Sequence, residues 1–225
     1  MARYNVHLLG INELEKLDLH GFWEHGLYYE VKTLPDRLSV MARFRLEYIG
    51  TANWETVLKS WEKSEQGIWD DFYKGRGFDT WTAWRMDYVR RFTGGRMIHR
   101  TIDIHRIINP MELVPTMWVG SFPGWRQYLP PGKMSQQFCG LVFNDAVRQN
   151  PKIVAIRKNP PKKTMLIGFT DGECISVLEG THRACAITLS SLEGIQLGGD
   201  VFIALIPFGK NQALAFERTY TFGSI

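Results

Sequence analysis

The sequence has few cysteines and no long apolar segment, and each absence excludes a class of protein. Its 225 residues include three cysteines, an odd number, and none lies in a Cys-x-x-Cys pair. A disulfide framework or a thiolate zinc site is therefore not expected. The longest apolar run has eight residues, from Val201 to Phe208, whereas a membrane-spanning helix needs about 20. Because the first residues also lack the basic and apolar segments of a secretory signal, we expect a cytoplasmic protein that does not enter the membrane.

An excess of positive charge is present only in the second half of the chain. Lys and Arg exceed Asp and Glu by 27 to 23, with 14 of each up to residue 98 and 13 against 9 from His99 onward. A stretch of twelve residues without an acid contains five of the later cations, Lys152, Arg157, Lys158, Lys162 and Lys163. Such a stretch attracts phosphate groups, but it is more commonly typical of a solvated turn. The net charge of +4 and the balanced first half argue against an extensive nucleic-acid surface.

The first 98 residues have mostly helical patterns and are rich in tryptophan. Residues 12–15 have the spacing of a capping box, and a helix could open at Pro35 and reach about Arg45. Apolar residues recur at helical spacing over 54–72, and a second helix is predicted over 79–93, before two glycines. Five tryptophans lie in these two helices. They could line a ligand pocket or a partner interface, although an aromatic stripe at this spacing more often belongs to a core.

From His99 onward the pattern changes to short β-branched segments separated by turns. A strand is predicted over 101–108, and a long Pro- and Gly-rich loop over 115–133 contains aromatic residues that could fold over a site. The remaining predicted elements are a helix at 135–150, strands at 153–157, 164–169 and 174–178, a helix at 181–193 and a strand at 201–206. The first two of these strands would form a hairpin with the basic residues at its turn.

These patterns predict an α+β protein with two regions. Residues 99–225 would form a small mixed sheet with flanking helices, and residues 1–98 would form a Trp-rich helical region before it. The N-terminal region would serve as a lid, as a wall of a substrate pocket or as the face of a homodimer.

The residues most suggestive of chemistry lie at 174–187, where a strand, a glycine turn and a helix follow one another. The first turn of a helix has unpaired N–H groups and a partial positive charge, and both favour a bound anion. Gly180 leaves room for a phosphate beside the backbone, Thr181 adds a hydroxyl donor, and Arg183 can make two parallel bonds to phosphate oxygens. The segment therefore predicts a phosphate-binding site.

This segment resembles part of a known superfamily. In the ParB/sulfiredoxin-like superfamily a helix that holds nucleotide phosphates opens with an acidic residue or Gly, then Gly, two variable residues and Arg, and residues 179–189 read EGTHRACAITL. The opening strand and Pro-x-Glu segment of the ParB-like free serine kinases are similar to residues 102–113, which read IDIHRIINPMEL. The resemblance covers about residues 102–207. It implies a ParB/sulfiredoxin-like fold for the second region.

The resemblance also implies a role for each matching residue. The phosphates of ATP, or of another nucleoside di- or triphosphate, would contact four consecutive residues, Gly180, Thr181, His182 and Arg183. Glu179 would contact magnesium or substrate, and Glu112 would be the base that accepts the proton of a substrate hydroxyl, because phosphoryl transfer needs such a group. Sulfiredoxin has its reactive cysteine at the position of Thr181, which argues against sulfinic acid reduction here.

Each of these residues also has an ordinary structural explanation. Glu112 can be a surface carboxylate after a strand, Glu179 an acid that stabilises a helix dipole, and His182 a hydrogen-bonding residue at a helix start. Arg183 is the hardest to explain in this way. The histidines within 99–105 do not complete a ligand set, so no metal site formed by protein side chains is predicted.

Two functions are compatible with these observations. The favoured one is ATP- and magnesium-dependent transfer of a phosphoryl group to a hydroxyl of a small molecule. The alternative is a protein without enzymatic activity in which the same residues bind a nucleotide as a switch, and the basic stretch holds nucleic acid or a protein partner.

Overall fold

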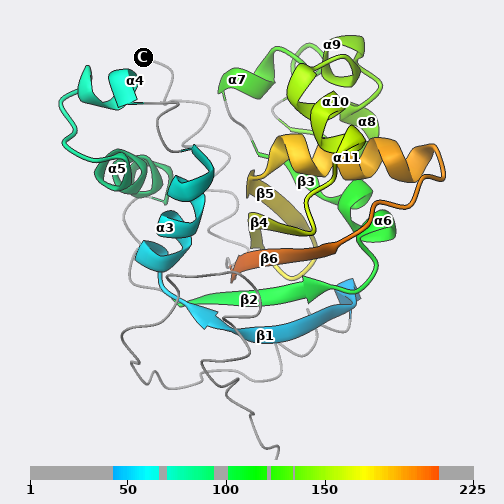
Figure 1. Ribbon diagram of the computed structural model, residues 1–225, viewed down its shortest axis with the longest axis horizontal. Helices are drawn as coiled ribbons and strands as arrows, with labels where there is room; N and C mark the ends of the chain where they lie inside the picture. Colours follow the sequence, from blue (N-terminus) through cyan, green and yellow to red (C-terminus); the bar gives the residue numbers. More distant parts are fainter. Residues whose placement is uncertain (1–42, 66–69, 94–100, 121–122, 134, 208–225) are drawn as a thin grey trace, which may run out of the picture. The chain divides into compact units, whose positions relative to one another are not determined.

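The computed structural model describes residues 43–65, 70–93, 101–120, 123–133 and 135–207 (Figure 1). They belong to two compact units, of which the first includes residues 49–103 and the second residues 43–48 and 104–207. The capping box predicted at residues 12–15, and most of the helix predicted at 35–45, lie outside the described residues. The predicted boundary between residues 98 and 99 stays a prediction.

The described residues of the first unit include the helices α3 (Trp54–Glu65), α4 (Asp70–Lys74) and α5 (Trp81–Thr93). The side chain of Asn53 caps α3, because its Oδ1 accepts a hydrogen bond from the backbone N–H of Thr56 at 2.9 Å. The helical pattern predicted over 54–72 corresponds to two elements, α3 up to Glu65 and α4 from Asp70, and the four residues between them lie outside the described residues. Trp54 and Trp81 are buried, which confirms the core explanation for these two tryptophans.

Six strands form one mixed sheet, which confirms an α+β architecture. Their order across the sheet is β1-β2-β6-β4-β5-β3. The bounds are β1 (Leu46–Ala52), β2 (Ile102–Ile107), β3 (Trp118–Val119), β4 (Lys163–Thr170), β5 (Ile175–Glu179) and β6 (Asp200–Pro207). Strand β4 pairs in parallel with β6 and antiparallel with β5, and β5 pairs in parallel with β3. Strand β1 lies in a region that was expected to be helical.

The helices of the second unit are mostly short. Their bounds are α6 (Pro110–Leu113), the 3-10 helix η1 (Val114–Thr116), α7 (Pro123–Arg126), α8 (Phe138–Leu141), α9 (Asp145–Arg148), α10 (Pro151–Lys158) and α11 (Thr181–Leu192). The long loop predicted at 115–133 thus contains η1, β3 and α7. The single helix predicted at 135–150 is wrong: α8 and α9 are separate, and Asn144 between them caps α9 by accepting from the backbone N–H of Ala146 at 3.0 Å.

The strand predicted at 153–157 is also wrong, because these residues lie in α10. The side chain of Asn150 accepts a hydrogen bond from the backbone N–H of Lys152 at 3.0 Å, and Pro151 occupies the first turn. Pro has no N–H to lose there and its fixed φ suits a helix start, so Asn-Pro opens a helix despite the β-branched residues that follow. The basic stretch is therefore a helix and its connection to β4, not a hairpin tip.

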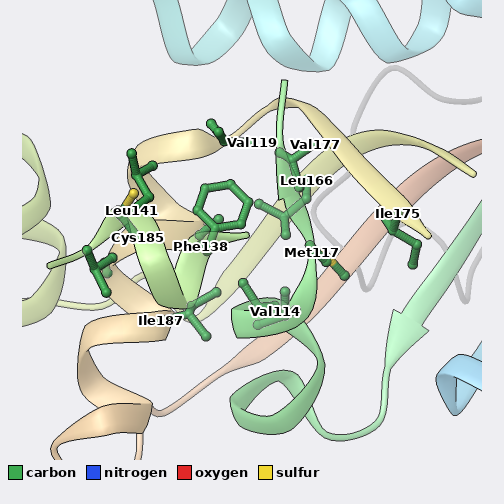
Figure 2. Close-up of a cluster of buried hydrophobic side chains, with 14 of the residues drawn as sticks. Val114, Met117, Val119, Phe138, Leu141, Leu166, Ile175, Val177, Cys185 and Ile187 are labelled. Atoms are coloured by element: carbon green, nitrogen blue, oxygen red, sulfur yellow. The ribbon is translucent and has the colours of Figure 1, made fainter. Parts of the chain in front are cut away.

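The core of the second unit fixes the position of α11. Seven consecutive residues of this helix, 184–190, are buried. Figure 2 shows side chains from α11, from strands β4 and β5, and from α8 converging on one cluster that includes Phe138, Leu166, Val177 and Cys185. Because strand β5 and helix α11 both contribute to this cluster, the turn that joins them is held in place from both sides. None of the described helices is long and apolar enough to cross a membrane.

Candidate functional site

The turn between β5 and α11 requires glycine. Gly180 is the residue that precedes the helix, and its φ of 94° and ψ of 16° lie in the left-handed region. A Cβ atom at this position would lie 2.5 Å from Cδ2 of Leu166, whose side chain is buried in the core. Both the backbone conformation and the lack of space therefore exclude a side chain.

The first turn of α11 is built without a side-chain cap. Gly180 offers no side-chain acceptor to the N–H groups of that turn. These groups carry the positive end of the helix dipole and can bond to an acceptor from outside the helix. Thr181 is buried, with 5% of its surface exposed, whereas His182 and Arg183 are partly exposed. The backbone and the side chains of His182 and Arg183 therefore form most of the surface at the helix start.

Arg183 and Glu179 form an ion pair across the glycine turn. Nη2 of Arg183 donates a hydrogen bond to Oε2 of Glu179, and the side chains are 24% and 17% exposed. Charge-assisted bonds of this kind are among the stronger ones in proteins. Both residues were predicted for the site, and the structure brings them together. In this arrangement the carboxylate of Glu179 neutralises the guanidinium that was predicted to bind phosphate.

His182 lies in an aromatic and positively charged environment. Its imidazole ring is 4.9 Å from the ring of Trp125, centroid to centroid, with an angle of 64° between the planes. Burial, together with the nearby charges of Lys152 and Arg183, lowers the pKa of His182 to about 4. The imidazole is therefore neutral at physiological pH. Lys152 adds positive potential near the helix start, whereas the charge of Arg183 is balanced by Glu179.

On its other side Arg183 borders a pocket of the second unit. The pocket is also lined by apolar side chains that include Met111, Ile156 and Ile187, and by the carboxylate-bearing residue Asp200. The enclosed space is about 20 Å³, and the rest of the hollow is open to solvent. Arg183 and Asp200 are its two charged lining residues. An oxygen of Asp200 is 3.7 Å from Nη1 of Arg106. The pocket thus offers one positive group, one negative group and an apolar wall.

Glu112 is not part of this pocket, although its neighbours Pro110 and Met111 are. It lies in the short helix α6, and its side chain is 68% exposed. Its Oε2 is 3.6 Å from Nη1 of Arg45, which is itself exposed. The structure therefore places Glu112 on the surface beside the pocket and in an exposed ion pair.

Three residues near the site lie outside the segment that the sequence predicts to bind phosphate: Trp125, Lys152 and Asp200. Trp125 lies in the aromatic loop and Lys152 in the basic stretch, but no local pattern indicates that either lies near His182. Among the residues that the structure describes, no group of three or more His, Cys, Asp or Glu side chains is placed to hold a metal ion.

Comparison with known proteins gives no relative. No family model matches the chain, and no curated protein and no solved structure matches it either.

Proposed function

We propose that the chain binds a nucleotide through its phosphates at residues 180–183 and transfers a phosphoryl group to a hydroxyl of a small molecule. The observation that carries this proposal is the glycine at the start of α11. It has φ of 94° and no side chain, and it precedes a twelve-residue helix whose first turn contains Arg183. No side chain caps the start of this helix, so its first backbone N–H groups can bond to an anion, and Arg183 adds a planar donor group.

The surroundings of the helix start support an anionic ligand. Lys152 and Arg183 both act electrostatically on His182, so a cation other than the one paired with Glu179 lies near the helix start. A nucleotide with several phosphate charges would be attracted to such a place more strongly than a neutral ligand. Magnesium would be held mainly by the phosphate oxygens of the nucleotide and by water, and would neutralise charge during transfer. Such an ion would need few protein ligands.

The pocket beside Arg183 supports a second, small ligand. It borders the helix start through Arg183, so an acceptor bound there would lie next to a phosphate held by the same side chain. Because the enclosed space is only about 20 Å³, an acceptor would bind mainly at the open mouth of the pocket, against its apolar wall and the carboxylate of Asp200. The resemblance to ParB-like free serine kinases assigns the base to Glu112, at the edge of this pocket. Glu112 would have to leave its ion pair with Arg45 to reach an acceptor hydroxyl.

That requirement favours the second candidate, a nucleotide-binding protein that performs no transfer. Glu112 is exposed and paired with Arg45, and Glu179 is paired with Arg183. Both predicted carboxylates are therefore engaged by arginines, and a proton acceptor at the pocket would have to be Asp200 or a rearranged Glu112. A nucleotide switch needs the phosphate-binding residues alone.

One experiment separates these possibilities. ATP with magnesium is titrated calorimetrically into wild type, Arg183→Ala and Glu112→Gln, and phosphorylated products are measured by mass spectrometry with a panel of small hydroxyl compounds. Arg183→Ala should weaken ATP binding by about 1.5 to 3 kcal/mol, the range for hydrogen bonds to charged groups. Glu112→Gln should leave binding unchanged but lower turnover by roughly 10² to 10⁴ if Glu112 is the base.

Arg157→Ala is a matched control, because Arg157 is also 24% exposed and also pairs with a glutamate, Glu193. It does not line the pocket. If the folded Arg183→Ala variant binds ATP with wild-type affinity, the proposed phosphate site is refuted. If wild type binds ATP but forms no phosphorylated product, the nucleotide-binding switch is the function that remains.

A further inference from the structure

The helix start has two sides that differ in chemistry. His182 and Arg183 are consecutive in α11, so their side chains leave the helix about 100° apart. Arg183 borders the pocket that contains Asp200. His182 contacts Trp125 of α7, whose ring in turn lies 5.5 Å from the ring of Tyr128 at an angle of 62°. A ligand whose phosphates lie at the helix start therefore has an aromatic surface on one side and a pocket with a carboxylate on the other.

The aromatic side has the features of a place where a flat ring can stack. Trp125 and Tyr128 are partly exposed, and both pack from their other parts against the core cluster. The core thus holds the indole in position while part of it stays accessible. Figure 1 shows α7 on the side of the sheet where α10 and α11 lie. Aromatic side chains beside a positively charged place are the combination that binds nucleotide bases together with their phosphates.

The charges on both sides of the helix start favour a phosphate chain on the side of His182. Lys152 lies near His182, so a polyphosphate chain that leaves the helix start on this side meets a second cation. Asp200, on the pocket side, would repel the same chain if it extended deep into the pocket. The imidazole of His182 is neutral at physiological pH and can contact a ring without losing the hydration of a charge.

We propose that Trp125 stacks on the base of the nucleotide, so that the nucleotide lies with its base at α7 and its phosphates at the start of α11. This assignment rests on the proposed function, because it needs phosphates at residues 180–183. It specifies the ligand further: a nucleotide with an aromatic base, not an inorganic polyphosphate or a sugar phosphate. It also reserves the pocket for the second ligand.

The assignment is tested by comparing two ligands that share their phosphates and differ in the base. ATP and inorganic tripolyphosphate, each with magnesium, are titrated calorimetrically into wild type, Trp125→Phe and Trp125→Leu. Stacking on an aromatic side chain accounts for about five- to hundredfold in affinity. ATP affinity should therefore fall from wild type to Trp125→Phe and further to Trp125→Leu, while tripolyphosphate affinity stays the same in all three.

Leucine keeps apolar volume against the core, so this variant tests the ring itself. A thermal melt of each variant establishes that it is folded. Phe143→Ala is the control for the loss of an exposed aromatic side chain, since Phe143 is 71% exposed and lies in neither side of the site. Its affinities for both ligands should equal those of wild type.

Two results overturn the assignment and differ from failure of the proposed function. If ATP binds Trp125→Leu as tightly as wild type, the base lies elsewhere. If ATP and tripolyphosphate lose affinity together, Trp125 supports the helix start and does not contact the base. If wild type binds neither ligand, the phosphate site itself is absent, and the proposed function fails with this assignment.

Discussion

Replacement of Gly180 by alanine should destabilise the protein for two reasons that the structure separates. A residue with a Cβ atom costs about 1 to 2 kcal/mol in the left-handed region, where Gly180 has φ of 94°. The new Cβ would also lie 2.5 Å from Cδ2 of Leu166, which is fully buried and cannot move away without disturbing its neighbours. Overpacking of this kind costs about 1 to 3 kcal/mol. The expected loss is therefore about 2 to 5 kcal/mol.

Gly194→Ala is the matched control, because it shares the backbone strain and lacks the steric clash. Gly194 has φ of 67°, and a Cβ atom there would meet no atom within 4 Å. Its replacement should cost about 1 to 2 kcal/mol. Urea denaturation at fixed pH gives both losses, provided the slope with urea concentration stays the same.

Leu166→Val tests the clash directly. In wild type this change should cost about 1 kcal/mol through loss of buried apolar volume. In the Gly180→Ala background it should cost less or restore stability, because it removes the atom that the new Cβ meets. If Gly180→Ala costs no more than Gly194→Ala, or if the two changes at 180 and 166 are additive, the described packing of this turn is wrong.

Two further predictions concern the side chains around the helix start. Glu179→Gln should bind tripolyphosphate without magnesium about two- to fivefold more tightly than wild type in calorimetric titration, because Arg183 loses a competing carboxylate. Weaker binding would instead indicate that Glu179 itself helps to hold the ligand. His182, with a pKa lowered to about 4 in the folded protein, takes up a proton more readily when unfolded. Its neutral form therefore stabilises the fold above about pH 6.5, and this contribution is lost as the pH falls through about 4. The difference in unfolding free energy between wild type and His182→Gln should change between about pH 6.5 and about pH 4 and be constant above pH 6.5. A difference that stays the same from pH 7 to 4 would contradict the burial of this ring.

The sequence was sufficient where local signals and tertiary structure agree. Strands β4, β5 and β6 and helix α11 lie close to the predicted ranges, because β-branched segments there are bounded by Asp171-Gly172, Gly180 and Gly194. The same signals failed at α10. There the pattern of Ile153 and Val154 favours a strand, but the capping by Asn150 and the position of Pro151 decide for a helix. Local capping thus outweighed β propensity, which depends strongly on context.

The sequence predicted which residues belong to the candidate site, but it did not predict the contacts between them. Residues 180–183 were identified because a strand, a glycine and a helix start are local features. The pairing of Glu179 with Arg183 depends on the left-handed turn at Gly180, which brings the last residue of a strand beside the first turn of a helix. The contact of His182 with Trp125 joins residues 57 positions apart in the sequence and arises only when α7 packs near α11. Periodicity and spacing carry no information about such a contact.

The burial of α11 has a consequence for how the protein would exchange its amide hydrogens with solvent. Residues 184–190 are buried without a break, so this helix has no solvent-facing side over nearly two turns. A helix that is covered all round cannot fray by itself, since each opening would expose part of the core to water. The amide hydrogens of residues 184–190 should then exchange only when the second unit unfolds as a whole. A ligand at the start of α11 would slow that exchange throughout the unit, including at strands on which it makes no contact.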